Sequence, residues 1–172
     1  MENVRVLEKP RLESKNKNEL VITREFDAPV ERVWKAWTDP ESMKRWWGPK
    51  EWSTPVFKMD FRVGGKFVMC MRGPDGTDIW GTGVYREIVP LQRFVVTDSF
   101  ADEKGNVVPA TKYGMSPDMP LEMLITVTLE KLGPNKTRMT LRHAGMPPSE
   151  QTGANQGWTE MFDKLVEYLA KR

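Results

Sequence analysis

Apolar residues recur at helical spacing near the end of the chain, over residues 157–171. Counted from Trp158 they fall at i, i+3, i+4, i+7, i+8 and i+11, which is one broad stripe on an α-helix. The stripe consists of Trp158, Met161, Phe162, Leu165, Val166 and Leu169. Gly153 and Gly157 weaken the start of this helix and predict a kink before Trp158. A helix of this kind must lay its stripe on a large apolar surface.

Alternating apolar and polar positions upstream predict that surface to be an antiparallel sheet. The first strand is expected over Glu19–Phe26. Six more are expected over residues 57–62, 66–72, 78–89, 93–100, 122–132 and 137–144. Tight turns such as Gly73–Gly76 separate several of them, so consecutive strands should form a meander. A twisted sheet of this length would curve around the helix and leave a gap between the two.

Two short helices are predicted between the first and second strands. Asp27 is a candidate N-cap and Pro29 suits a first helical turn. The following apolar residues, Val30, Val33, Trp34 and Trp37, have helical spacing. Asp39-Pro40 ends that helix, and a second runs from Pro40 to Trp46.

Two stretches lack such periodicity. Residues 1–19 are charged and are interpreted as an N-terminal arm, with a single domain over residues 20–172. Residues 102–119 contain two glycines, two prolines and few large apolar groups, which predicts a long loop.

Composition and charge exclude several classes of function. The net charge of +2, from 26 basic and 24 acidic residues, argues against a nucleic-acid partner. No apolar run reaches the ~20 residues of a membrane span, and the N-terminus lacks the apolar core of a signal peptide. Cys70 is the only cysteine, which favours a reducing cytoplasm. With His143 as the only histidine, a cysteine/histidine metal cluster is excluded, and no cofactor, metal or catalytic motif is recognised.

Seven tryptophans and eleven methionines are a surplus for 172 residues. Tryptophan supplies large apolar area, and methionine fills irregular and adaptable spaces. The surplus indicates either a roomy interior or simply a methionine-rich core.

Several short motifs occur in a characteristic order. They are Ile22–Pro29, Val33–Pro40, Trp46–Pro49, Val63–Phe67, Arg72–Gly76, Gly83–Ile88 and Gly157–Trp158. In this order the chain resembles the START-like, birch-pollen-allergen-like superfamily (SRPBCC). Within it, the chain is similar to the bacterial family named after the activator of the heat-shock chaperone ATPase. The resemblance covers roughly residues 20–170. It implies an α+β helix-grip fold, in which a curved antiparallel sheet wraps around the long C-terminal helix.

Candidate ligand-binding residues lie on the apolar phase of the strands, in the Trp46–Trp47 pair or on the helix stripe. They are Trp46, Trp47, Phe57, Met59, Phe67, Met69, Met71, Trp80, Tyr85, Phe100, Met123, Leu141, His143, Trp158 and Phe162. Each could instead fill a closed core. Trp80 and Tyr85 have opposite phases unless the strand bulges near Gly81 and Gly83, so which of them points inward stays open.

His143 is in phase with Met139 and Leu141 and is expected at the cavity mouth. It could act as a general acid or base, or be satisfied by a backbone partner. Acidic and basic residues within the strands, including Arg86, are expected mostly to face water.

Three hypotheses follow from these patterns and the resemblance. The first is a protein that binds a small hydrophobic or amphipathic molecule between the sheet and the C-terminal helix. The second is an enzyme of the polyketide cyclase/dehydratase kind, with Tyr85, Arg86 and His143 as the first residues to test. The third is a module that contacts a chaperone; a homodimer is also possible. An open apolar cavity favours the first, several inward polar groups the second, and a filled interior with an exposed apolar patch the third.

Overall fold

The computed structural model describes residues 18–171. The predicted arm over residues 1–19 therefore lies almost wholly outside the described residues, apart from its last two positions. The elements are β2 (Glu19–Phe26), α2 (Val30–Thr38), α3 (Pro40–Trp46), β3 (Ser53–Met59), β4 (Lys66–Arg72), β5 (Asp78–Val89), β6 (Arg93–Ala101), the 3-10 helix η2 (Ala110–Tyr113), β7 (Met123–Gly133), β8 (Lys136–Ala144) and α4 (Pro148–Ala170). This order confirms the predicted α+β helix-grip fold.

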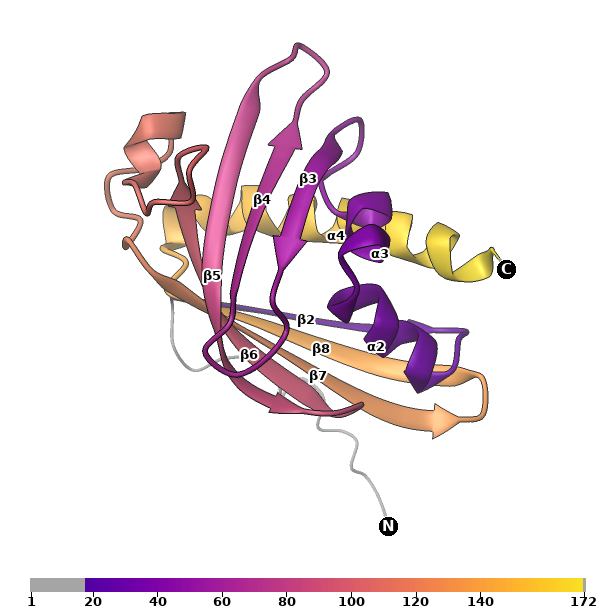
Figure 1. Ribbon diagram of the computed structural model, residues 1–172. Helices are drawn as coiled ribbons and strands as arrows, with labels where there is room; N and C mark the ends of the chain where they lie inside the picture. The colour runs from indigo at the N-terminus through magenta and orange to yellow at the C-terminus, as the bar shows by residue number, and fades with distance from the viewer. Residues whose placement is uncertain (1–17, 172) are drawn as a thin grey trace.

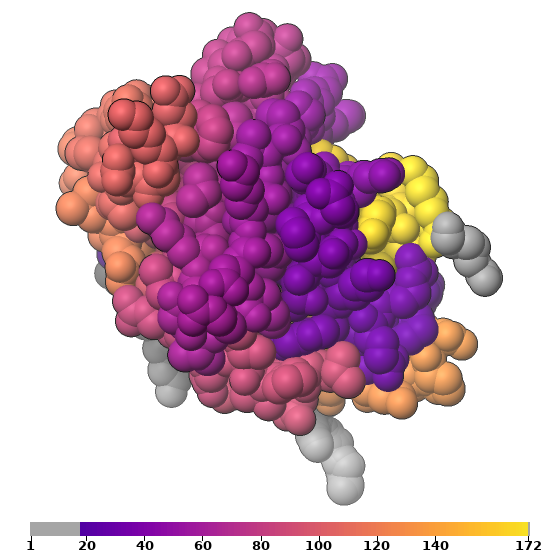
Figure 2. Space-filling model, in the orientation of Figure 1, coloured from indigo at the N-terminus to yellow at the C-terminus, as the bar shows by residue number. Residues whose placement is uncertain are grey.

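Within residues 18–171 the strands form one seven-stranded sheet in the order β2-β8-β7-β6-β5-β4-β3. Every neighbouring pair is antiparallel. Strands β3 to β8 follow one another in a meander, and β2 pairs with β8 at the end of the series. The sheet curves, and α4 runs across its concave side (Figure 1). In the space-filling view, α2 and α3 cover part of α4, of which only one end is visible beside them (Figure 2).

A proline lies at the start of each short helix, as the N-cap of α2 and as the first residue of α3. The residue that follows each helix has an extended backbone. The N-cap of α2 is Pro29, whose extended backbone directs its carbonyl to the N–H groups of Arg32 and Val33 at 3.0 and 3.2 Å. The prediction of Asp27 as the N-cap was therefore wrong, because the helix begins only at Val30 and Pro29 occupies the N-cap position. Asp39 caps α3 as a carboxylate that accepts from the Ser42 backbone N–H at 2.9 Å.

The C-terminal helix is longer than its apolar stripe. It runs without interruption from Pro148 to Ala170, through both glycines, rather than over residues 157–171. The stripe is buried as predicted except for Val166, which is 41% exposed at the edge of the contact. The added turns carry small residues, and for that reason the stripe alone did not reveal them.

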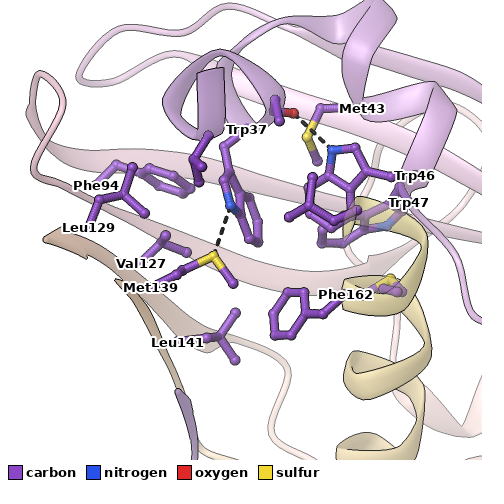
Figure 3. Close-up of a cluster of buried hydrophobic side chains, with 14 of the residues drawn as sticks. Trp37, Met43, Trp46, Trp47, Phe94, Val127, Leu129, Met139, Leu141 and Phe162 are labelled. Carbon is purple, nitrogen blue, oxygen red and sulfur yellow. Dashed lines mark hydrogen bonds between the residues drawn. The ribbon is translucent and has the colours of Figure 1, made fainter. Parts of the chain in front are cut away.

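Tryptophan rings form the centre of the core (Figure 3). Trp37 lies against Trp46, with ring centroids 4.8 Å apart, and its indole N–H donates to Met139 Sδ at 3.2 Å. The indole N–H of Trp46 donates to the Ala36 carbonyl at 3.0 Å. Phe162 of α4 packs on both rings. These indoles are buried without losing their hydrogen bonds, as large amphipathic rings in a core require.

The stretch predicted as a loop, residues 102–119, contains η2 and is attached to the sheet. The Tyr113 hydroxyl donates to the Ala101 carbonyl at 2.5 Å and accepts from the Trp80 backbone N–H at 3.3 Å. The Tyr113 ring also lies 5.7 Å from that of Phe100. Tyr113 therefore joins this segment to β5 and β6, together with the backbone hydrogen bond from the Val108 N–H to the Phe100 carbonyl at 3.0 Å.

Truncation on α4 tests whether its stripe organises the fold. Phe162 is 0% exposed, so Phe162→Ala should lower the free energy of unfolding by roughly 3–5 kcal/mol. Val166→Ala on the exposed edge is the matched control, with a change of about 0.5 kcal/mol at most. Urea titration of both variants measures the difference, and equal changes would contradict the packing described here.

Two glycine substitutions should act in opposite directions. A Cβ at Gly153 meets nothing within 4 Å, so Gly153→Ala should stabilise the helix by up to about 1 kcal/mol. A Cβ at Gly83 would lie 1.9 Å from the Thr97 carbonyl oxygen, so Gly83→Ala should destabilise the protein. Thermal unfolding of the two variants gives the sign of each effect. Stabilisation by both would show that β5 and β6 are not packed as closely as the structure has them.

Candidate functional site

A cavity of about 470 Å³ lies between the concave face of the sheet and the first half of α4. Strands β4, β5 and β6 supply one wall, α4 supplies another, and residues of the segment before β7 complete the lining. The volume falls within the range of roughly 300–1,000 Å³ that is usual for small-molecule sites.

The wall is mainly sulfur and aromatic carbon. Its methionines are Met69, Met71, Met115, Met119, Met123, Met146 and Met161, and its aromatic rings are Trp47, Phe100 and Trp158. Most of the chain's methionines therefore surround this one space. Thioethers are polarizable and flexible, and they make favourable contacts with aromatic rings.

A short polar chain enters the cavity from β8. The indole N–H of Trp158 donates to His143 Nδ1 at 3.1 Å. Because an indole can only donate, Nδ1 acts as the acceptor and the ring's proton resides on Nε2. Nε2 lies 3.0 Å from Asp98 Oδ2. That oxygen lies off the direction of the N–H bond, so Nε2 has a close ionic neighbour but no well-aligned acceptor.

Sheet register explains this juxtaposition. Ile125 of β7 pairs with His143 of β8, and Met123, two positions before it, pairs with Asp98 of β6. Alternation then places His143 and Asp98 on the same concave face, with β7 between them. The partner of His143 is thus a side chain of α4, not the backbone group that the sequence suggested.

Eight of the residues predicted to bind a ligand line this cavity. They are Trp47, Met69, Met71, Trp80, Phe100, Met123, His143 and Trp158. The other seven pack into the core away from it: Trp46, Phe57, Met59, Phe67, Tyr85, Leu141 and Phe162. The division follows position along each strand. On β4, for example, Phe67 stacks on Phe57 at 5.7 Å, whereas Met69 on the same face borders the open space.

The structure also settles the arrangement of β5. The bulge lies between Tyr85 and Glu87, not at the glycines, so Trp80 and Tyr85 keep opposite phases. Tyr85 points inward but is only 4% exposed, with its ring 4.9 Å from that of Phe61. A Cβ at Gly81 would come within 2.6 Å of Met69 Cε, so glycine at this position leaves the methionine room at the wall.

Several wall residues were not predicted from the sequence. Met115 and Met119 lie in the segment that read as a loop, and Met146, Glu150 and Ala154 come from the turn before α4 and its first turns. Glu150 Oε2 accepts the Ser116 backbone N–H at 3.0 Å, which joins the segment to α4. Two methionines in a loop with few other large apolar residues are the sequence signal from which a position at the cavity wall could have been predicted.

Most of the ionisable side chains that could take part in catalysis are either buried in the protonated form or directed to solvent. Burial raises the pKa of the Tyr85 hydroxyl, and burial, followed by the charge of Asp78, raises the pKa of the Cys70 thiol to about 11. Neither group is an anion near neutral pH. Arg86 points to solvent and lies 3.5 Å from Glu122. Of Tyr85, Arg86 and His143, only His143 borders the cavity.

Over residues 18–171, no three His, Cys, Asp or Glu side chains are grouped so that they could hold a metal ion. In the same part of the chain, no helix has both the length and the apolar character needed to cross a membrane.

Comparison with known proteins places the chain in a family. Residues 27–170 match the model of the family described as activator of Hsp90 ATPase homolog 1-like protein, and the chain belongs to that family. No match was found among the curated proteins.

Solved bacterial structures share the fold along nearly the whole chain. A protein from Arthrobacter aurescens is 32% identical, with a TM-score of 0.75, over 91% of this chain and 88% of its own. A protein from Nitrosomonas europaea is 26% identical, with a TM-score of 0.74, over 91% and 97%. A protein from Chromobacterium violaceum is 26% identical, with a TM-score of 0.75, over 90% and 99%.

The hydrogen bond between Trp158 and His143 can be measured by a double-mutant cycle. Trp158→Phe removes the donor and His143→Phe removes the acceptor, while both keep a ring in place. We expect a coupling free energy of about 0.5–1.5 kcal/mol, the usual net contribution of an intramolecular hydrogen bond. Urea unfolding of the wild type, both single variants and the double variant gives this value. Strict additivity would show that the bond does not contribute to stability.

Proposed function

We propose that this protein binds a small apolar or amphipathic molecule in the cavity between its sheet and α4. The observation that carries the proposal is the cavity itself, which has about 470 Å³ of space within a wall of methionine and aromatic side chains. Such a space has the size and the apolar surface of a ligand site, with few polar groups to orient what enters.

The composition of the wall supports a ligand rather than an accidental packing gap. Side chains around an empty apolar space lose dispersion contacts on one side, which makes such spaces costly. Methionines can adapt to an occupant of variable shape, whereas branched side chains would favour one rigid arrangement. Small residues on α4, namely Gly153, Ala154 and Gly157, hold the space open from the helix side.

The two other hypotheses receive less support. An enzyme using Tyr85 and Arg86 would need both at the cavity, and they lie in the core and in solvent respectively. A chaperone-contact module was expected to have a filled interior, which differs from the space found here. The lone thiol of Cys70 is buried and unpaired, in keeping with action in a reducing cytoplasm.

A substitution that narrows the cavity tests the proposal. Nile red, a neutral apolar fluorophore, should bind the native protein with a micromolar Kd, equivalent to about −8 kcal/mol. Ala154→Phe places a ring in the cavity and should weaken binding at least about tenfold, because it takes up the space that the probe needs. Fluorescence titration measures both affinities.

The matched control is Asn155→Phe, which adds the same ring at an exposed position one residue along α4. It should leave the affinity for Nile red within about twofold of the wild type, since surface changes rarely reach a buried site. Melting temperatures verify that both variants fold. If the wild-type protein does not bind the probe, or if both variants lose it equally, the interior is not a ligand site. Native mass spectrometry of freshly purified protein then offers an independent search for a retained molecule.

A further inference from the structure

The ionised side chains of the cavity wall carry one sign. Its lining includes the carboxylates of Asp98 and Glu150 but no lysine or arginine. His143 accepts a hydrogen bond from Trp158 at Nδ1 and so contributes a neutral ring. The space is therefore apolar with a negative field inside it.

Neither carboxylate has a cationic side chain as a partner. Within residues 18–171, no lysine or arginine nitrogen lies within ion-pair distance of Asp98 or Glu150. Asp98 has the neutral His143 ring beside it, at 3.0 Å. Its side chain is 22% exposed, so most of its hydration has been removed.

Nearby basic groups have other partners. Arg72 at the end of β4 pairs with Asp78 at 2.7 Å, and Arg86 pairs with Glu122 at 3.5 Å. Lys164 of α4 donates to the carbonyls of Trp47, Gly48 and Trp52, the shortest contact being 2.8 Å. The charge that would neutralise the cavity is absent from its own wall.

Aromatic rings strengthen the preference for a cation. Trp47, Phe100 and Trp158 border the space with inward-facing rings. The face of an aromatic ring attracts a cation, and tryptophan does so best. A partly desolvated carboxylate gains from an ammonium partner, whereas an anionic ligand would meet like charge in a medium that screens it poorly.

We infer that the cavity selects a cationic amphiphile, namely an amine whose ammonium group pairs with Asp98 and whose apolar body lies among the methionines and rings. Glu150 adds to the negative field from the first turn of α4. This inference rests on the proposed function, since it names the class of molecule that the same cavity takes. Fatty acids and other carboxylates of similar size are then poor ligands.

Three probes with one naphthalene body separate charge from hydrophobicity. They are 1-naphthylmethylamine, 1-naphthalenemethanol and 1-naphthoate, which carry a cation, a neutral hydroxyl and an anion. Isothermal titration calorimetry of the full chain at neutral pH should show the amine binding about tenfold or more tighter than the alcohol, with the carboxylate weakest.

Substitution of Asp98 tests the proposed contact. Asp98→Asn keeps the shape and removes the charge, so it should weaken the amine about tenfold and leave the alcohol within about twofold. Asp163→Asn makes the same change on the outer face of α4, where the side chain is 60% exposed, and should affect neither probe. Glu150→Gln is a second variant, independent of the contact with His143, and should weaken the amine by a smaller factor.

The outcomes distinguish the inference from the proposed function. If the alcohol binds as well as the amine, or the carboxylate binds tightest, the preference for a cation is wrong while the ligand cavity stands. An amine preference that survives both Asp98→Asn and Glu150→Gln overturns the inference as well. If none of the three probes binds and Nile red also fails, the proposed function itself is refuted.

Discussion

The contact between α4 and the concave face of the sheet is the constraint on which the other features depend. Towards the C-terminal end of the helix, Phe162, Leu165 and Leu169 are large and almost fully buried. Towards its start, small residues such as Ala154 and Gly157 face the same side. The helix is therefore held by its large residues at a height that leaves a space beneath its small ones.

The rest of the molecule fits around that space. The segment between β6 and β7 lines part of it and is joined to the sheet by the Tyr113 hydroxyl and to the helix by the Ser116–Glu150 hydrogen bond. Tyr113 makes two hydrogen bonds and a ring contact with Phe100, and the Val108 N–H donates to the Phe100 carbonyl. These mainly polar contacts differ from the ring packing around Trp37. The part of the protein around Trp37 is thus held together by a large buried apolar area. The segment beside the cavity is held mainly by a few polar contacts. This division gives the site a stable base and an adaptable wall.

The polar chain from Trp158 through His143 to Asp98 is unusual in so apolar a setting. Buried polar groups weaken a core unless each finds a partner. Here Nδ1 of His143 is satisfied, but Nε2 has only an off-line carboxylate, and the indole N–H of Trp47 in the same wall has no partner among the described residues. Both groups are donors, so a ligand satisfies them only if it carries an acceptor, such as a hydroxyl or carbonyl oxygen, in addition to any ammonium group.

Periodicity in the sequence was enough to predict most of the elements and their antiparallel order, although β3 covers Ser53–Met59 rather than residues 57–62 and α4 begins earlier than its stripe. The spacing from Trp158 to Leu169 identified the helix, and alternation placed Met69, Phe67 and His143 on one face of the sheet. These are local properties, because the period of a helix or strand is set by backbone geometry. The family motifs confirmed the same order, and the matched family and solved structures agree with it.

Only the tertiary structure decided which inward residues border a cavity and which fill the core. Phe67 and Met69 share a strand and a face, yet one stacks in the core and the other lines the space. That difference depends on the distance between α4 and each position of the sheet. The volumes of side chains on α4, which are distant in the sequence, set this distance. The pairing of Asp98 with His143, and of Glu150 with Ser116, likewise joins residues from separate elements. Periodicity gives the direction of a side chain; its distance from the opposite wall is a property of the packed whole.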